Sequence, residues 1–168
     1  MLITGSRMNP AEKEGPAVSQ PQSRPESEPE AESAAVYSVD HRLSYADCDP
    51  AGIVYYATWF PLMERTHTEW WLSMGYRFDT FGGTYGAVPV TRHTECSYLS
   101  VTRLFDLVRC SMRIEAVGRT SYRLGFEFTR SPEGERVAYG RLTLVSIDGA
   151  GKPVPVPPPL RELLVRHR

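Results

Sequence analysis

The pattern of hydrophobic and polar positions changes its period along this chain. From Val36 to Tyr45, in VYSVDHRLSY, the two kinds of residue alternate. Alternation is typical of a half-buried strand, so His41 and Leu43 are expected on one face and Ser38 on the other. The ordered part of the protein is therefore predicted to begin with a strand.

A helical period follows this strand. Large side chains recur at steps of four and three, at Tyr56, Phe60, Met63, His67, Trp70 and Met74. Such spacing predicts an amphipathic helix. Pro61 is tolerated only in the first turn of a helix, so the helix is expected to begin two or three residues before it. Gly75 supplies the stop.

The rest of the chain predicts one sheet. FGGTYG is interpreted as a glycine-rich loop, and four alternating segments follow, at 87–99, 106–117, 120–130 and 136–147. A short helix is expected near the C-terminus. The order of one strand, one long helix and four antiparallel strands predicts an α+β fold in which a five-stranded sheet covers one side of the helix.

Composition divides the chain into a tail and a domain. Residues 1–35 are rich in Pro, Glu and Ser and carry few large apolar side chains, so we predict a disordered acidic tail. Residues 36–168 are predicted to form a single domain. The first 36 residues carry three basic and six acidic groups, and the remaining 132 carry sixteen and fourteen. The domain is therefore slightly basic.

Charge and cysteine usage narrow the classes of function. With 19 basic and 20 acidic residues the charge is nearly balanced, which favours neither a nucleic-acid nor a membrane partner. No apolar run is long enough for a membrane span. Cys48, Cys96 and Cys110 are widely spaced and odd in number, which fits free thiols in the cytoplasm better than a disulfide framework or a metal site.

Two carboxylates stand at the entrance to the predicted helix. In YADCDPAGIVYYATWF, Asp47 and Asp49 occupy a predicted turn before an aromatic, amphipathic segment. Aspartate favours turns because its side chain bonds nearby backbone N–H groups. Alternatively, a carboxylate beside a helix N-terminus can take part in chemistry. The turn role is favoured for Asp47.

The segments DCDPAGIVYYATWF and ERTHTEWWLSMGY resemble the hotdog-fold acyl-CoA thioesterases, specifically the 4-hydroxybenzoyl-CoA thioesterase type. The resemblance covers residues 37–165. It implies a curved antiparallel sheet around one central helix, subunits paired as a homodimer or homotetramer, an acyl-CoA substrate and no cofactor. It also implies that Asp49 is the catalytic carboxylate and that the backbone N–H of Tyr56 polarises the thioester carbonyl.

The resemblance further implies binding residues. Tyr55 and Trp59, near the helix start, are candidates for the acyl pocket, and Glu64 falls where hydroxybenzoyl-specific relatives place an aspartate. The glutamate side chain is longer than that of aspartate, so the alternative that Glu64 is an ordinary exposed helical residue stays open. Arg119, with Thr120 and Ser121, occupies the turn that contacts the coenzyme A nucleotide in the family. An arginine suits phosphate because its planar fork donates two parallel hydrogen bonds.

Chemistry agrees with the implied catalytic pair. Hydrolysis of a thioester needs a nucleophile or an activated water, together with donors for the developing oxyanion. Unpaired N–H groups at the positive end of a helix dipole are such donors. An ordinary aspartate is a weak general base at neutral pH but is ionised. Direct attack by Asp49 through a mixed anhydride is therefore favoured, and activation of water stays open.

The neighbouring cysteine and histidine have packing roles as their simplest interpretation, and other classes of hotdog protein fit the sequence less well. Cys48 is interpreted as a packing residue and His67 as a core histidine. Hotdog hydratases place a His five residues after the Asp, whereas Gly52 and Val54 stand at those positions here. Two alternatives stay open: a noncatalytic acyl-binding protein, and a thioesterase for short-chain acyl-CoA or acyl-carrier-protein substrates. Relatives in that second branch carry a His where Tyr56 stands, so aryl or other bulky acyl groups are favoured.

Overall fold

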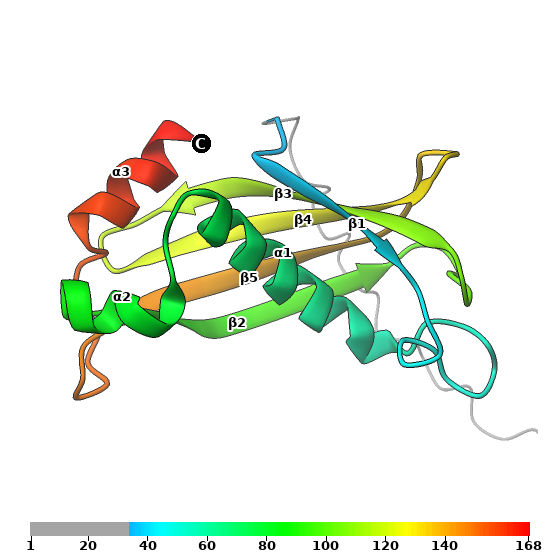
Figure 1. Cartoon of the computed structure of the whole chain (residues 1–168), viewed down its shortest axis with the longest axis horizontal. Coiled ribbons are helices and arrows are strands. Elements are labelled where there is room, and N and C mark those ends of the chain that lie inside the picture. Colours follow the sequence, from blue (N-terminus) through cyan, green and yellow to red (C-terminus); the bar gives the residue numbers. More distant parts are fainter. Residues whose placement is uncertain (1–33) are drawn as a thin grey trace, which may run out of the picture. The chain divides into compact units, whose positions relative to one another are not determined.

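The computed structural model describes residues 34–168, so the predicted tail lies outside the described residues except for its last two positions. The elements in chain order are β1 (Tyr37–Arg42), the 3-10 turn η1 (Tyr56–Thr58), α1 (Trp59–Ser73), α2 (Phe78–Tyr85), β2 (Val88–Tyr98), β3 (Leu107–Val117), β4 (Ser121–Ser131), β5 (Glu135–Ile147) and α3 (Pro158–Arg166) (Figure 1).

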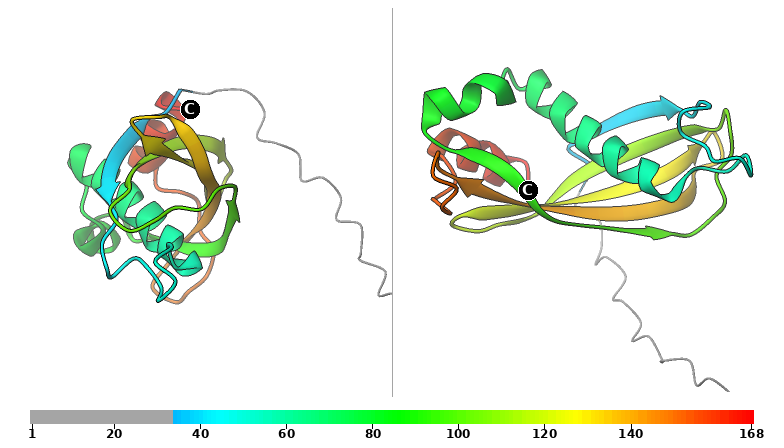
Figure 2. Two further views of the ribbon diagram at one scale, coloured as in Figure 1. Left: turned by 90° about the vertical axis from the view of Figure 1, so that its right-hand side faces the viewer. Right: turned by 90° about the horizontal axis from the view of Figure 1, so that it is seen from below.

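The five strands form one antiparallel sheet in the order β1-β3-β4-β5-β2. The sheet curves around α1, which crosses its concave face (Figure 2). The first and last strands of this order, β1 and β2, are the two edges. This arrangement confirms the predicted α+β hotdog fold.

α1 fills the concave face because its apolar stripe is buried. Met63, Trp70 and Trp71 are each 0% exposed. Beneath the helix, β5 carries Gly140, and a Cβ at that position would lie 2.6 Å from the Met63 Sδ and 2.8 Å from the Glu95 carbonyl oxygen. The missing side chain therefore lets the helix lie close against the sheet.

The ends of α1 follow the sequence signals. The helix begins at Trp59, which places Pro61 in its first turn, where no intrahelical N–H bond is lost. It ends at Ser73, and Gly75 follows with a φ of +81°, a conformation that favours glycine. No helix in residues 34–168 is long and apolar enough to cross a membrane.

The interpretation of FGGTYG as a loop was wrong, because residues 81–85 belong to the helix α2 and Gly86 caps its C-terminus. Phe81 is 2% exposed and its ring packs edge-on against Trp71, with the centroids 4.9 Å apart. A Cβ on Gly82 would lie 2.6 Å from a methyl group of Val88. Tertiary packing thus offsets the poor helix propensity of two glycines, and one of them permits the close approach to β2.

The first strand is shorter than predicted. β1 ends at Arg42, and Tyr45 is 78% exposed, with its ring edge-on to Phe105. After Leu43, whose N–H donates to the Asp106 carbonyl, the chain turns away because the Asp47 carboxylate accepts the N–H of Ser44. A local side-chain hydrogen bond therefore replaces the strand pairing.

His67 lies in the core, as the sequence favoured. It is 3% exposed, and its Nε2 accepts a hydrogen bond of 2.9 Å from the indole N–H of Trp71. Burial lowers the pKa of His67 to about 3, because a charged imidazolium would lose its hydration. The side chain is therefore neutral and serves packing and hydrogen bonding.

The contact between Gly140 and α1 generates the first prediction. Gly140→Ala should lower the free energy of unfolding by about 1–3 kcal/mol, because the added methyl forces Met63 or the β2 backbone to move. Urea unfolding followed by circular dichroism measures this change. Gly83→Ala in α2, where an added Cβ meets no atom within 4 Å, is the control and should not destabilise the protein. Equal midpoints for Gly140→Ala and the unmodified chain would contradict the packing argument.

Candidate active site

The loop between β1 and η1 is held to the helix start by Asp47. Its carboxylate accepts the N–H and the hydroxyl of Ser44 at 2.8 and 2.7 Å. Its carbonyl oxygen accepts the N–H of Tyr55 at 2.9 Å and the hydroxyl of Thr58 at 3.1 Å. Asp47 therefore has the hydrogen-bonding role that the sequence favoured.

Asp49 lies in a tight turn directly after this anchor. Its N–H donates to the Ile53 carbonyl at 2.9 Å, and its Oδ1 accepts the N–H of Ala51 at 2.8 Å. Gly52, with a φ of +74°, closes the turn in a left-handed conformation. Within residues 34–168 no Lys, Arg or His pairs with this carboxylate. The half-buried carboxylate thus keeps an oxygen free for a ligand.

Cys48, between the two carboxylates, is not an activated thiol. It is half-buried and forms an isolated β-bridge with Val54. Burial raises the pKa of the thiol, and the negative charges of Asp47, Asp49 and Asp106 raise it further. Because the thiolate is the nucleophilic form, this environment favours a packing role.

The helix start that follows the Asp49 turn presents unpaired backbone donors. Tyr55 is the N-cap of η1, and its side chain makes no capping hydrogen bond. The first N–H groups of a helix have no intrahelical acceptor, so those of Tyr56 and Ala57 are free for a ligand. Asp49 follows Asp47 by two residues, and the Asp47 carbonyl holds Tyr55, so at most about 7 Å of chain separates the Asp49 backbone from that carbonyl. The Asp49 turn and the helix start are therefore joined through Asp47.

A pocket of about 340 Å³ lies at this helix start. It is lined by Ile53, Val54, Tyr56, Trp59 and residues 98–102. Trp59 is 3% exposed and packs on Phe128, so it forms a rigid wall. Tyr56 is 60% exposed at the same place. The structure thus brings Tyr56 and Trp59, both predicted from the sequence, to one concave and largely apolar site.

Sequence reasoning missed Tyr98, which ends β2 and lines the same pocket. Its hydroxyl donates to the Tyr56 carbonyl at 3.1 Å. The pairing of β2 with β5 and the hydrogen bond from the Val54 N–H to the Thr102 carbonyl bring this segment to the helix start. No local signal in the sequence could have revealed this meeting of residues 42 positions apart.

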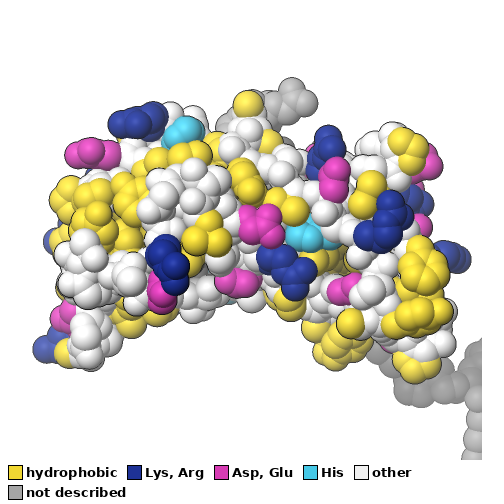
Figure 3. All heavy atoms as spheres, in the orientation of Figure 1, with side chains coloured by type: hydrophobic (Ala, Val, Ile, Leu, Met, Phe, Trp, Pro, Cys, Tyr) yellow, Lys and Arg dark blue, Asp and Glu magenta, His cyan; other side chains and the backbone are white. Residues whose placement is uncertain are grey.

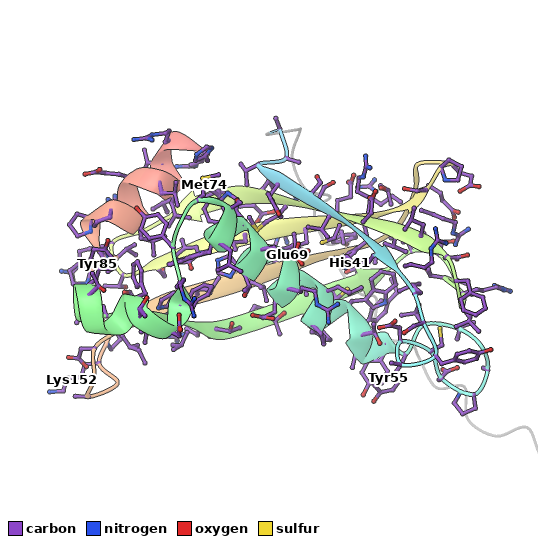
Figure 4. The ribbon with its side chains drawn as sticks, viewed as in Figure 1. His41, Tyr55, Glu69, Met74, Tyr85 and Lys152 are labelled. Carbon is purple, nitrogen blue, oxygen red and sulfur yellow. The ribbon has the colours of Figure 1, made fainter. Side chains whose placement is uncertain are left out.

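Apolar side chains are exposed around the pocket end of the domain. Those more than 45% exposed there are Tyr45, Tyr55, Tyr56, Tyr98, Leu99, Val101 and Phe105. Figure 3 shows yellow side chains at the right-hand end, where the loop after β1 and η1 lie. Tyr55, which precedes η1 (Figure 4), does not line the pocket.

The predicted nucleotide-binding turn lies at the other end of the sheet. β3 begins at Leu107, which pairs with Arg42 beside the Asp49 loop, and it ends at Val117, just before the turn that contains Arg119. The ten intervals from Leu107 to Val117, at about 3.3 Å each, place the Arg119 turn roughly 33 Å along β3 from the Asp49 end. Within one chain Arg119, Thr120 and Ser121 therefore do not meet Asp49.

Glu64 also lies apart from the pocket. It is exposed on α1, and its carboxylate accepts the hydroxyl of Thr68 at 2.7 Å. Among residues 34–168 no group of three or more His, Cys, Asp or Glu side chains is placed to hold a metal ion, and Cys48, Cys96 and Cys110 are free thiols.

Solved structures share this fold at low sequence identity. Slr0204, a 1,4-dihydroxy-2-naphthoyl-CoA thioesterase from Synechocystis, has a TM-score of 0.72 and 15% identity over 77% of this chain and 95% of its own. The DHNA-CoA thioesterase from Staphylococcus aureus has a TM-score of 0.69 and 16% identity over 77% and 88%. BH1999 gentisyl-coenzyme A thioesterase has a TM-score of 0.65 and 19% identity, over 74% of this chain and 98% of its own.

Sequence comparison identifies the family. No curated protein gives a significant match to this chain. The family model of the thioesterase-like superfamily matches residues 43–164, which begin just after β1 and include the Asp49 loop, α1 and the four long strands. The thioester hydrolase class predicted from the sequence is confirmed by this match, and the chain belongs to the thioesterase-like superfamily.

Proposed function

We propose that the protein hydrolyses an acyl-CoA thioester to a free acid and coenzyme A, with an aryl or other bulky acyl group favoured. The observation that carries this proposal is the uncapped helix start at Tyr56, which opens on a 340 Å³ pocket beside the Asp49 turn. The donors and the carboxylate are the two components that thioester hydrolysis requires.

In the proposed mechanism the thioester carbonyl oxygen lies at the Tyr56 N–H. Negative charge develops on this oxygen as the carbonyl carbon is attacked, and the positive end of the helix dipole stabilises it. The Asp49 carboxylate attacks the carbon, the C–S bond breaks, and the coenzyme A thiolate leaves and takes a proton. Water then hydrolyses the mixed anhydride, which releases the acid and restores Asp49. In the alternative route Asp49 takes a proton from the attacking water.

The pocket supports a flat acyl group. Tyr56, Trp59 and Tyr98 supply aromatic walls, and aromatic rings pack favourably against one another in offset or edge-on contacts. A volume near 340 Å³ is at the small end of ligand pockets. Two of the similar structures are named for aryl thioesters, 1,4-dihydroxy-2-naphthoyl-CoA and gentisyl-coenzyme A. These features favour an aryl acyl-CoA over a long flexible chain.

Coenzyme A recognition by Arg119 requires a second subunit. β2 is an edge strand whose residues 90–95 are all exposed, and natural proteins usually cover or pair such an edge. Antiparallel pairing of β2 with β2 of a second copy reverses the second chain. The Arg119 turn of that copy then lies at the Asp49 end of the first. Thr120 lies in the same turn and Ser121 begins β4 directly after it, so both lie beside Arg119.

The Arg119 turn also lines a pocket that could hold a ligand. Arg119 lines a pocket of about 570 Å³ together with Arg161 of α3. Arg161 donates a hydrogen bond to the Gly118 carbonyl, which fixes it beside the turn. Two guanidinium groups around one pocket favour a phosphate-bearing ligand. We also propose that Glu64, which is exposed on α1, contacts the substrate when two subunits combine.

A panel of acyl thioesters tests the proposed function. Aryl-CoA, short-chain acyl-CoA and acyl-carrier-protein substrates are each assayed for released thiol. Aryl-CoA is expected to give the highest kcat/KM. A highest value for short-chain or carrier-protein substrates would favour the alternative branch. Binding of acyl-CoA without thiol release would identify a noncatalytic acyl-binding protein and contradict the proposal.

Two matched variants test the catalytic carboxylate. Asp49→Asn keeps the shape of the side chain and removes its charge, so kcat should fall by about 10²–10⁴-fold. Asp47→Asn, two residues away, retains an oxygen that can accept from Ser44 and should lose less than about tenfold. If Asp49→Asn kept more than about a tenth of the activity, a loss of only about 1.4 kcal/mol in barrier stabilisation, the assigned role would be wrong.

Assembly through β2 gives a separate prediction. Light scattering should report a dimer or a tetramer, and Thr94→Glu should shift the protein toward monomer, because like charges would face each other across the paired edges. The control is Val165→Glu, at an exposed position on α3, which should leave the assembly intact. A fully active monomer at micromolar concentration would contradict both the pairing and the shared site.

A further inference from the structure

Tyr98 links the free edge of the sheet to the start of the long helix. Its hydroxyl donates to the Tyr56 carbonyl at 3.1 Å, and its ring lines the pocket beside that residue. The side chain is 49% exposed, so burial in the core does not explain why a tyrosine stands there. The hydroxyl has one observed protein partner, and that partner is the residue whose N–H faces the proposed reaction.

The hydrogen bond acts on the peptide units that carry the proposed donors. The Tyr56 carbonyl and the Ala57 N–H belong to one peptide unit, and the Tyr56 N–H belongs to the unit before it. The Tyr55 carbonyl of this earlier unit accepts the Thr58 N–H at 2.9 Å. The Tyr55 N–H, one unit further back, donates to the Asp47 carbonyl, also at 2.9 Å. On the sheet side the Tyr98 hydroxyl holds the later unit.

We propose that Tyr98 is a positioning residue for thioester hydrolysis, whose hydroxyl orients the turn at Tyr56 and Ala57 so that its N–H groups point at the substrate carbonyl oxygen. The inference rests on the proposed function. A donor to the Tyr56 carbonyl also polarises that amide, which makes the Ala57 N–H, the neighbour of the Tyr56 N–H in the turn, a stronger donor. Tyr98 therefore acts on the transition state through the backbone, without touching the reacting atoms.

The surroundings of Tyr98 keep its hydroxyl a donor. Burial raises the pKa of the phenol, and the neighbouring Cys96 thiol and Tyr56 phenol raise it further. The hydroxyl is accordingly protonated throughout the neutral range. Its ring has a second and separable effect, because it forms a wall of the acyl pocket. Removing the hydroxyl and removing the ring should thus change different kinetic constants.

The test compares variants of the full-length chain on an acyl-CoA that the unmodified protein hydrolyses. A neutral hydrogen bond changes an equilibrium by about two- to tenfold. Tyr98→Phe should therefore lower kcat by about three- to tenfold and leave KM within about twofold. Tyr98→Leu should also raise KM, because the pocket wall is lost. The control is Tyr139→Phe on β5, which pairs with Ser97 on the opposite face of the sheet and should change neither constant.

Amide hydrogen exchange by NMR supplies a readout independent of activity. In Tyr98→Phe the Tyr55 and Thr58 amides, whose hydrogen bonds close the turn, should exchange faster, while core amides of β4 are unchanged. An unchanged kcat overturns the inference. A reduced kcat with unchanged exchange also overturns it, because the hydroxyl would then act directly on the substrate. If the unmodified protein hydrolyses no acyl thioester, the proposed function fails, and the exchange data still decide whether Tyr98 holds the turn.

Discussion

The close contact between α1 and the middle of β5 is the constraint on which the rest of the structure depends. Gly140 leaves room for Met63, and the buried aromatic side chains of the helix fill the remaining concave face. Once this contact fixes the helix, its first turn lies beside the end of β2, where Tyr98 and the pocket are found. The position of the backbone donors is therefore a consequence of core packing rather than of the loop alone.

The two aspartates of the loop have different roles. Asp47 is saturated with hydrogen bonds from Ser44, Tyr55 and Thr58, so it determines the path of the chain. The Asp49 carboxylate accepts one backbone N–H, that of Ala51, and keeps its other oxygen free. Rigid support beside a free functional group is the arrangement that catalysis needs, because small displacements of a reacting atom reduce the rate strongly. The D-x-D pattern at the helix entrance thus combines one structural and one proposed chemical carboxylate.

The periodicity of apolar residues predicted those elements of the fold that are determined by residues close together in the sequence. The stripe of apolar residues and Pro61 gave the start of α1, and alternation gave the four long strands to within two residues. α2 was not predicted because it contains two glycines and is stabilised by tertiary packing, in which Phe78 and Phe81 contact Trp71. The contact of Tyr98 with Tyr56 was not predicted, because strand order and register bring together these two residues that are far apart in sequence. The distance of Arg119 from Asp49 was not predicted either, because it depends on the length and direction of β3 in the sheet.

A crystal structure with an acyl-CoA analogue whose thioester sulfur is replaced by CH₂ tests the central claim most directly, because the ketone keeps the carbonyl and cannot be hydrolysed. The account predicts that the carbonyl oxygen lies about 2.7–3.2 Å from the Tyr56 N–H, with the acyl group against Trp59 and the Asp49 carboxylate facing the carbonyl carbon. An analogue bound with its carbonyl away from this helix start, or with Asp49 turned from the carbon, would contradict it.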